Sequence, residues 1–249
     1  MKALITNDDG IDSPGLAVLA RAAGAAGLDV LVAAPSWDSS GASSSLTGVE
    51  RDGRLKSARR RLPGTEISAH AVDAAPAMIA VVALRGGLGS LPTMVLSGVN
   101  CGRNTGHAVL HSGTVGAALT GSNHGARGMA ISLDSSHPEH WDTAGQVAER
   151  VIRWLATTGS DVVVNVNVPD VAVADLRGLR VAPLAQVGAV QTHVTDTGQG
   201  YLEVTFAPPA EPEPGTDAAL LADGWAVATP LRALSEDHEA DVSQLVLSS

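Results

Sequence analysis

Two adjacent aspartates near the N-terminus, Asp8 and Asp9, are the first residues of this chain whose types and spacing could do chemistry. They follow the short apolar segment 2–6, and Gly10 directly after them favours a turn. Two neighbouring carboxylates at the end of a strand repel each other and lose hydration, and a divalent cation relieves both penalties. The alternative is a solvated Asp-Asp-Gly turn, and this motif by itself leaves the two interpretations equally open.

Neutral oxygen donors follow two further apolar segments. Ser39 and Ser40 lie beyond residues 29–34, and Asn100 lies just beyond residues 93–97. In an open parallel sheet the carboxyl ends of the strands share one edge, so we expect these side chains to lie near the aspartates. Two carboxylates, a hydroxyl and an amide oxygen suit Mg²⁺, Mn²⁺ or Ca²⁺ better than Zn²⁺ or Cu²⁺. The pattern alone does not choose between the two serines.

A second candidate element is the run Ser112, Gly113 and Thr114, which opens an apolar helical stretch. Free backbone N–H groups at a helix N-terminus, with the Ser and Thr hydroxyls, form a cradle for an anion. The alternative is an ordinary Ser N-cap. His107 and His111 precede this run at i,i+4 spacing, but neighbouring glycines favour a loop over a zinc-binding helix. Either histidine could contact a phosphate or protonate a leaving oxygen.

Short apolar strands alternate with Ala-rich helices in the part of the chain that must position these residues. This alternation predicts βαβ units, and therefore an α/β fold with a mostly parallel sheet. We expect strands at residues 2–6, 29–34, 93–97, 128–133 and 162–168, and helices at residues 14–27, 75–85, 113–122 and 141–157.

The alternation of apolar strands and Ala-rich helices ends at about residue 180. Residues 187–195 and 200–206 predict two strands of a hairpin joined by an Asp-Thr-Gly-Gln-Gly turn, and residues 225–229 predict one more strand. We therefore divide the chain into an α/β core at residues 1–180 and a C-terminal extension at residues 181–249 that packs on the core.

The composition excludes several classes of function. Sixteen Lys and Arg against 26 Asp and Glu leave a formal net charge of −10, which argues against polymeric nucleic acid or an anionic membrane as a partner. Only four Trp, one Tyr and one Phe are present, too few for a platform that stacks single-stranded bases. Cys101 is the only cysteine, which excludes an internal disulfide. With no signal-peptide pattern and no long apolar run, we expect a cytoplasmic protein.

Several motifs occur in the order and spacing of one known family. They are Asn7-Asp8-Asp9-Gly10-Ile11, Pro14-Gly15, Ala34-Pro35 followed by Ser40-Gly41-Ala42-Ser43, Ser97-Gly98-Val99-Asn100, Ser112-Gly113-Thr114-Val115, and then Thr216-Asp217, Gly224 and Thr229-Pro230-Leu231. With these motifs the chain resembles the SurE family, metal-dependent nucleotidases that remove phosphate from nucleoside monophosphates. The resemblance extends over nearly the whole chain.

The resemblance implies a Rossmann-like, three-layer core and a C-terminal hairpin extension that pairs subunits into homodimers or homotetramers. It also implies one divalent ion per subunit, Mg²⁺ or Mn²⁺, with Ca²⁺ able to occupy the site. The family's metal ligands fall on Asp8, Asp9, Ser40 and Asn100. Its phosphate-binding residues fall on Ser112, Gly113, Thr114 and Asn104. Asp9 is our candidate for the general base, and His111 is a second candidate catalytic residue.

Three positions depart from the family pattern. Residues 74–79 replace a Gly-Thr-Pro-Ala-Asp-Cys-like stretch, residues 106–108 replace an acidic Gly-Asp-Asp, and His111 replaces an aromatic residue. We therefore predict a 5′-nucleotidase with an altered or narrowed substrate preference. The alternatives are a phosphatase for another phosphate ester, such as a specialised metabolite or short polyphosphate, and a non-catalytic nucleotide-binding protein.

Overall fold

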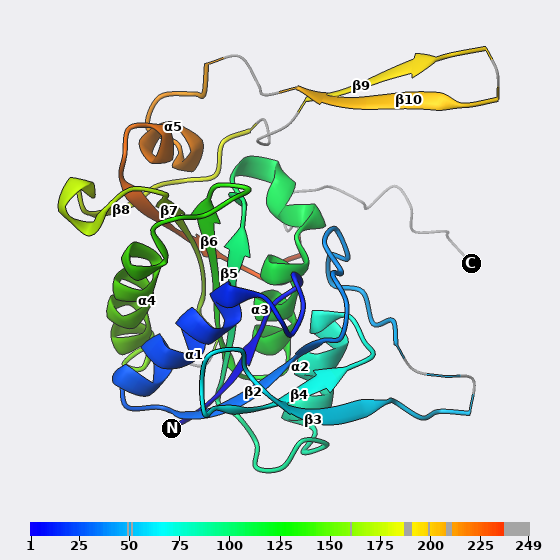
Figure 1. Cartoon of the computed structure of the whole chain (residues 1–249). Coiled ribbons are helices and arrows are strands. Elements are labelled where there is room, and N and C mark those ends of the chain that lie inside the picture. The colour runs from blue at the N-terminus through cyan, green and yellow to red at the C-terminus, as the bar shows by residue number, and fades with distance from the viewer. Residues whose placement is uncertain are drawn as a thin grey trace, which may run out of the picture.

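The computed structural model describes residues 1–48, 50, 52–159, 161–186, 191–198, 200–207 and 211–236. A nine-stranded sheet forms the middle layer, in the order β3-β4-β2-β1-β5-β6-β7-β11-β8, and helices cover both of its faces (Figure 1). Its strands are β1 (Lys2–Thr6), β2 (Asp29–Pro35), β3 (Ser57–Arg61), β4 (Ser68–Val72), β5 (Met94–Cys101), β6 (Arg127–Asp134), β7 (Val163–Pro169), β8 (Leu179–Val181) and β11 (Ala226–Leu231).

The central strands are parallel and buried on both faces. Leu4 of β1 lies between Leu31 of β2 and Val95 of β5, and the side chains of Leu4 and Val95 are fully buried. Among the sheet's pairings, β3 with β4 and β11 with β7 are antiparallel. Continuous apolar strands are the pattern of a sheet covered by helices on both sides. The predicted α/β class with a mostly parallel sheet is confirmed.

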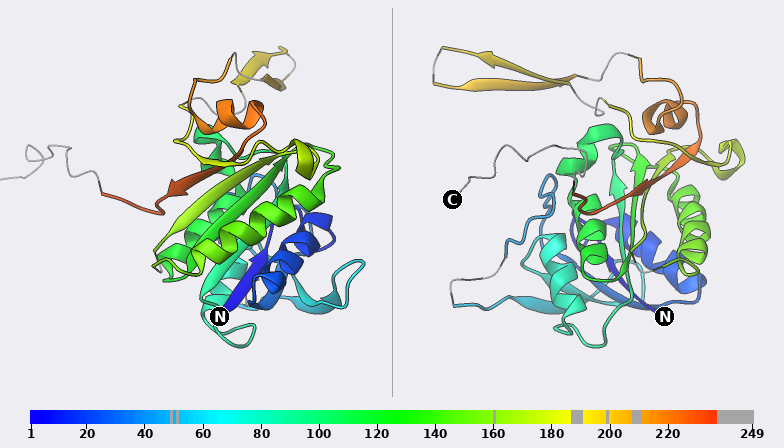
Figure 2. Two further views of the ribbon diagram at one scale, coloured as in Figure 1. Left: turned by 90° about the vertical axis from the view of Figure 1, so that its left-hand side faces the viewer. Right: turned by 180° about the vertical axis from the view of Figure 1, so that it is seen from behind.

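The helices pack in two pairs. Helices α1 (Pro14–Ala25) and α4 (Trp141–Leu155) pack against each other on one face, and α2 (Pro76–Leu84) and α3 (Gly113–Asn123) pack against each other on the other (Figures 1 and 2). Proline occupies the first turn of α1 and of α2, where its missing N–H costs nothing. These four helices match the predicted helices to within two residues at either end.

Six short elements of the described chain were not expected from the sequence: β3, β4, β8, helix α5 (Asp217–Ala222), and the 3₁₀ helices η1 (Gly106–His111), where a loop was expected, and η2 (Val173–Asp175). All five residues of β3 are exposed and its sequence is Ser-Ala-Arg-Arg-Arg, so it has no apolar alternation. Such an edge strand forms because β4 pairs with it, and its charges protect the edge from other strands.

The C-terminal part contributes both to the sheet and to a separate hairpin. Strand β11 lies between β7 and β8, and the expected boundary at residue 180 falls within β8. The predicted hairpin is present as β9 (Gln191–Asp196) and β10 (Leu202–Ala207), and it projects away from the sheet (Figure 2). Residues 187–190 of the expected first hairpin strand, residue 199 of its turn and residues 237–249 lie outside the described residues.

None of the helices in the described part of the chain is long and apolar enough to cross a membrane.

Candidate metal and phosphate site

The carboxyl end of β1 meets the N-terminus of α3. The Asp8 side chain is buried, and its Oδ2 accepts the backbone N–H of Thr114 at 3.0 Å while its Oδ1 accepts the Thr114 hydroxyl. A Cβ atom added at Gly113 would lie only 2.8 Å from Asp8 Oδ2. A glycine at this helix start therefore permits the close approach. The structure brings together the two motifs that the sequence singled out, although 106 residues separate Asp8 from Thr114.

Burial makes this aspartate pair electrostatically unfavourable without a cation. The pKa of Asp9 is raised to about 7, mainly by burial and secondly by the neighbouring charge of Asp8. Burial also raises the pKa of Asp8, against the two hydrogen bonds from Thr114 that lower it. The Oδ2 atom of Asp9 is buried with no hydrogen-bond partner. A buried oxygen without a partner is rare in folded proteins, and a bound cation would satisfy it.

Asn100 reaches the same edge of the sheet from the end of β5. Its Nδ2 donates to the carbonyl of Gly102 at 2.7 Å and to that of Cys101 at 3.2 Å. These two bonds orient the amide, so that Asn100 Oδ1 lies 3.4 Å from Thr114 Oγ1. The predicted convergence of Asp8 and Asn100 at one sheet edge is therefore present, and the amide oxygen faces the aspartate side of the site.

The two serines that the sequence pattern left open have different surroundings. Ser39 donates its N–H and its hydroxyl to the carbonyl of Asp8, at 2.7 Å and 3.1 Å, which ties the loop after β2 to the end of β1. Ser40 is exposed and donates its hydroxyl and its N–H to Asp38 Oδ1, at 2.6 Å and 2.9 Å. The lone pairs of the Ser40 oxygen are not used by this donation.

Asp38 is a residue of the site that the sequence reasoning missed. Besides holding Ser40, its charge contributes to the raised pKa values of Asp8 and Asp9. The sequence does show an acidic residue two positions before Ser40, which could have indicated a role at the site. However, Asp38 lies in a Ser-rich loop with no apolar periodicity, so its position relative to the strands could not be predicted. Only the fold of the loop shows which groups it faces.

The residues at this edge fit a hard divalent cation. Across the described residues, no group of three or more His, Cys, Asp or Glu side chains is placed to hold a metal. A cation here would therefore use two carboxylates with neutral oxygens, which is the set expected from Asp8, Asp9, Ser40 and Asn100. Oxygen donors of this kind suit Mg²⁺, Mn²⁺ or Ca²⁺.

Asn104 anchors the loop that leads to α3. Its Nδ2 donates to Ser132 Oγ of β6 at 2.9 Å, and its N–H donates to Asn167 Oδ1 at 2.8 Å. Its carbonyl accepts the Asn165 and Asn167 side chains of β7 at 2.8 Å and 2.9 Å. The phosphate-binding role of Asn104 stays a prediction. The sequence reasoning missed the β7 asparagines, whose signal was two polar residues in an otherwise apolar strand.

Comparison with known proteins identifies the family of this chain. Residues 3–190 match the family model described as Survival protein SurE. This chain belongs to the SurE family. It is 36% identical to the 5′-nucleotidase SurE of Alkalilimnicola ehrlichii and also to that of Xanthomonas campestris pv. campestris, with 93% of this chain and 89% of each relative covered. The crystal structure of the SurE protein from Aquifex aeolicus superposes with a TM-score of 0.80 at 28% identity, covering 98% of both chains.

The predicted resemblance is thus confirmed, and the departures from the SurE pattern can be located. Residues 74–79 lie at the start of α2, where Ala74 and Ile79 are fully buried in the core. His107 and His111 are exposed on the 3₁₀ helix η1 (Gly106–His111), which directly precedes the start of α3. The changes at 74–79 therefore affect packing, whereas the two histidines face solvent beside the site.

Ser112 caps α3, since its Oγ accepts the Val115 N–H at 3.1 Å. The ordinary N-cap interpretation is therefore correct for this oxygen, but accepting a bond leaves the hydroxyl hydrogen available to a ligand. Thr114 differs, because both its N–H and its hydroxyl are directed at Asp8. In this structure Thr114 positions a carboxylate.

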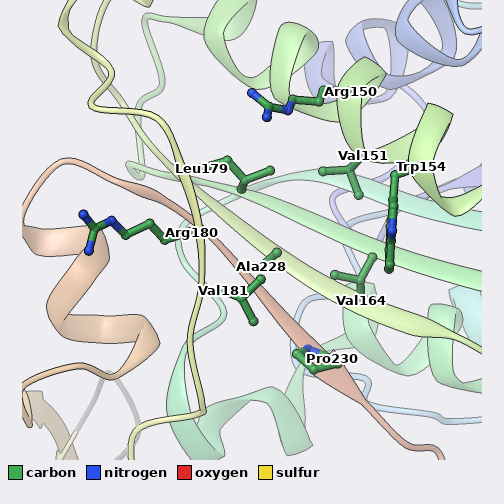
Figure 3. A pocket seen from close by; sticks show the side chains of 9 residues that line it. All are labelled: Arg150, Val151, Trp154, Val164, Leu179, Arg180, Val181, Ala228 and Pro230. Carbon is green, nitrogen blue, oxygen red and sulfur yellow. The ribbon is translucent and has the colours of Figure 1, made fainter.

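A cavity lies away from these residues. Its volume is about 370 Å³, and it opens between α4 and the β8 and β11 edge of the sheet (Figure 3). None of the predicted site residues lines it. Its walls are Arg150, Val151, Trp154, Val164, Leu179, Arg180, Val181, Ala228 and Pro230.

Proposed function

We propose that this chain is a metal-dependent phosphomonoesterase that hydrolyses nucleoside 5′-monophosphates to nucleoside and phosphate. The observation that carries the proposal is the contact between Asp8 and the N-terminus of α3. It joins a cation-binding carboxylate pair to an anion-binding helix start, and a phosphate ester needs both. The SurE relatives named as 5′-nucleotidases support the same activity.

The residues at the site have separate roles in this proposal. A divalent cation held by Asp8, Asp9, Ser40 and Asn100 would polarise a phosphoryl oxygen and lower the pKa of water. The Gly113 N–H and the Ser112 hydroxyl bind the other phosphoryl oxygens, and such preorganised donors match the charge of the transition state. Thr114 holds Asp8 in place.

Proton transfer is assigned to two further groups. We assign the proton of the attacking water to Asp9, in addition to its role in holding the cation. The water oxygen forms a bond to phosphorus, and the bond from phosphorus to the ester oxygen breaks. His111, exposed at the end of η1, donates a proton to the leaving oxygen.

One observation favours a second class of substrate, phosphate esters that carry no nucleobase. His111 stands exposed where the family pattern has an aromatic residue, so a flat apolar face for a nucleobase is lost at this position. A phosphatase that acts on a different phosphate ester, without a base to stack, is therefore the second candidate function.

Phosphate release from a panel of esters tests both candidates. The panel contains the four common nucleoside 5′-monophosphates, one 3′-monophosphate, p-nitrophenyl phosphate and a short polyphosphate, each with Mn²⁺ and with EDTA. We expect Mn²⁺-dependent release that is fastest with a 5′-monophosphate. A preference for an ester without a base would select the second candidate, and release that is unchanged in EDTA would overturn metal dependence.

Two matched variants connect the activity to the site. Asp8→Asn should lower turnover by orders of magnitude, because it removes charge from the cation site. Asp12→Asn is the control, since Asp12 is an exposed acid nearby that pairs with Arg60 at 3.5 Å. Undiminished turnover of Asp8→Asn at saturating Mn²⁺ would reject the assignment.

We also propose that the β9–β10 hairpin joins copies of this chain into a homodimer or homotetramer. Val194 pairs with Val204, and Leu202 shares their face, so three exposed apolar side chains form one stripe on the hairpin. An isolated two-stranded hairpin is marginally stable in water, and a partner that covers the stripe would stabilise it.

Two lysine substitutions on opposite faces of β10 test the assembly. Val204→Lys should lower the molar mass measured by light scattering, because it places a charge in the stripe. Glu203→Lys, on the other face, should leave the mass unchanged. Equal masses for wild type and Val204→Lys at low micromolar concentration would reject the hairpin as the interface.

A further inference from the structure

A fully buried carboxylate lies outside the site described above. Asp217, the first residue of α5, has no exposed surface. Its Oδ2 accepts the N–H of Gly106 at 2.9 Å, and its Oδ1 accepts the N–H groups of Ala185 and Ala218, each at 2.8 Å. One carboxylate therefore joins three segments of the chain, and the most distant bond links residues 111 positions apart.

The hydrogen bond from Gly106 to Asp217 holds the loop that leads to Ser112 and Gly113, the proposed phosphate-binding residues at the start of α3. Gly106 is buried and begins η1, which ends at His111 directly before the Ser112 cap of α3. Gly106 has a positive φ of 55°, a conformation that favours glycine. Any rotation of this loop would displace the exposed histidines and the cap.

The loop has a second anchor two residues earlier. The backbone of Asn104 is held by Asn165 and Asn167 of β7. The loop is therefore fixed from two sides, by the sheet at Asn104 and by α5 at Gly106. Figure 1 shows α5 beyond the carboxyl ends of the central strands, on the side where the loop lies.

The third segment bound by Asp217 leads toward the hairpin. Ala185 lies between β8 and β9, and its N–H shares Oδ1 with the first turn of α5. A hydrogen bond from N–H to a buried carboxylate is stronger than one between neutral groups. The carboxylate thus connects the C-terminal part of the chain to the substrate side of the site.

We propose that Asp217 is a positioning residue for phosphate-ester binding, which acts by fixing the loop at Gly106. This inference rests on the proposed function for its substrate. Asp217 does not contact the phosphate. It keeps His111 and Ser112 in register with Asp8, and it makes the shape of the substrate site depend on the C-terminal part.

The substitution Asp217→Asn isolates the contact to Gly106. The Asn Oδ1 can still accept from Ala185 and Ala218, whereas its Nδ2 would meet the Gly106 N–H donor to donor. An unsatisfied buried donor costs about 1–3 kcal/mol, which corresponds to roughly 5- to 150-fold in an equilibrium constant. Asp223→Asn is the control, because Asp223 ends the same helix, is exposed and uses its backbone carbonyl to hold Arg177.

Steady-state kinetics with Mn²⁺ and a nucleoside 5′-monophosphate test the proposal. We expect Asp217→Asn to raise KM and the inhibition constant of inorganic phosphate together, by about tenfold or more, with a smaller change in kcat. Asp223→Asn should match wild type. A purely structural role would lower the melting temperature and the active fraction while leaving KM and the phosphate inhibition constant unchanged, and that result would overturn the proposal.

Hydrogen exchange of the wild-type amides tests the same contact without any variant. The Gly106 amide should exchange as slowly as amides of the central strands, because its acceptor is fully buried. Fast exchange at Gly106 in the folded protein would overturn the proposal. If wild type released no phosphate from any ester, the proposed function would fail, whereas this exchange measurement would still test whether Asp217 holds the Gly106 N–H.

Discussion

The contact between Asp8 and the start of α3 predicts the effect of adding a single methyl group. In Gly113→Ala the new Cβ would lie 2.8 Å from Asp8 Oδ2, 2.9 Å from Asp8 Cβ and 3.2 Å from Asp8 Cγ. Ordinary contact begins at 3.4 Å, so the carboxylate oxygen must move by about 0.6 Å (3.4 − 2.8). The clash with Cβ means that rotating the side chain alone does not relieve it.

Asp8 has little freedom to make this movement. It is buried, and both of its carboxylate oxygens are bound by Thr114, the residue next to the substitution. Overpacking of this kind costs about 1–3 kcal/mol, and because Gly113 is the first residue of α3 rather than an interior one, the helix propensity of alanine offsets little of this cost. We therefore expect a modest loss of stability. A displacement approaching 1 Å at the reacting centre can reduce the rate by about 10²-fold.

The assay is Mn²⁺-dependent phosphate release per folded molecule, with a calorimetric Mn²⁺ titration and a thermal unfolding curve for each variant. Gly24→Ala is the matched control. Gly24 is an exposed glycine inside α1 with nothing within 4 Å of an added Cβ, so this variant should keep full activity and gain up to about 1 kcal/mol of stability. Wild-type kcat/KM and Mn²⁺ affinity in folded Gly113→Ala would refute the reasoning that this packing builds the site.

Three further predictions concern the acids around the cation site. Asp38→Asn keeps an acceptor oxygen for Ser40 and removes only the charge, whereas Asp38→Ala removes both the acceptor and the charge. We therefore expect the Mn²⁺ affinity measured by calorimetry to fall more in the alanine variant than in the asparagine variant. Identical affinities of the two variants would show that Asp38 does not hold Ser40 for the cation. Burial raises the pKa of Asp9 from 3.8 to about 7, and a cation must displace that proton, so Mn²⁺ affinity should rise by up to about tenfold per pH unit below pH 7 and level off above it. Between pH 3.8 and about pH 7, Asp9 of the folded metal-free protein keeps a proton that the unfolded chain has lost. The free energy of unfolding of the metal-free protein should therefore fall as the pH rises through this range. A free energy of unfolding that does not change with pH, measured by chemical denaturation, would contradict the raised pKa of Asp9.

The sequence by itself determined the α/β class, the central strands and the four long helices. Continuous apolar segments such as 2–6 and 128–133 indicate burial on both faces, and such strands form wherever helices cover a sheet. It also placed Asp8, Asp9 and Asn100 at one edge, because the carboxyl ends of parallel strands converge. These inferences rely on local periodicity and on a general rule of topology.

Short and exposed elements were beyond this reasoning. Strand β3 is exposed throughout and β8 has three residues, so neither has an apolar pattern to detect. Both exist because a neighbouring strand supplies backbone hydrogen bonds. The adjacent serines Ser39 and Ser40 have the same chemistry, and only the course of the loop directs one to the Asp8 carbonyl and the other to Asp38.

Only the tertiary structure decided which groups hold the site residues in place. Thr114 binds Asp8 across 106 positions of sequence, Asn167 binds Asn104 across 63, and Asp217 binds Gly106 across 111. A hydrogen bond needs its two atoms within about 3 Å, and at these separations that distance is set by the packing of whole elements rather than by neighbouring residues. The sequence therefore determined which side chains carry the chemistry, and the packing decided how each one is held.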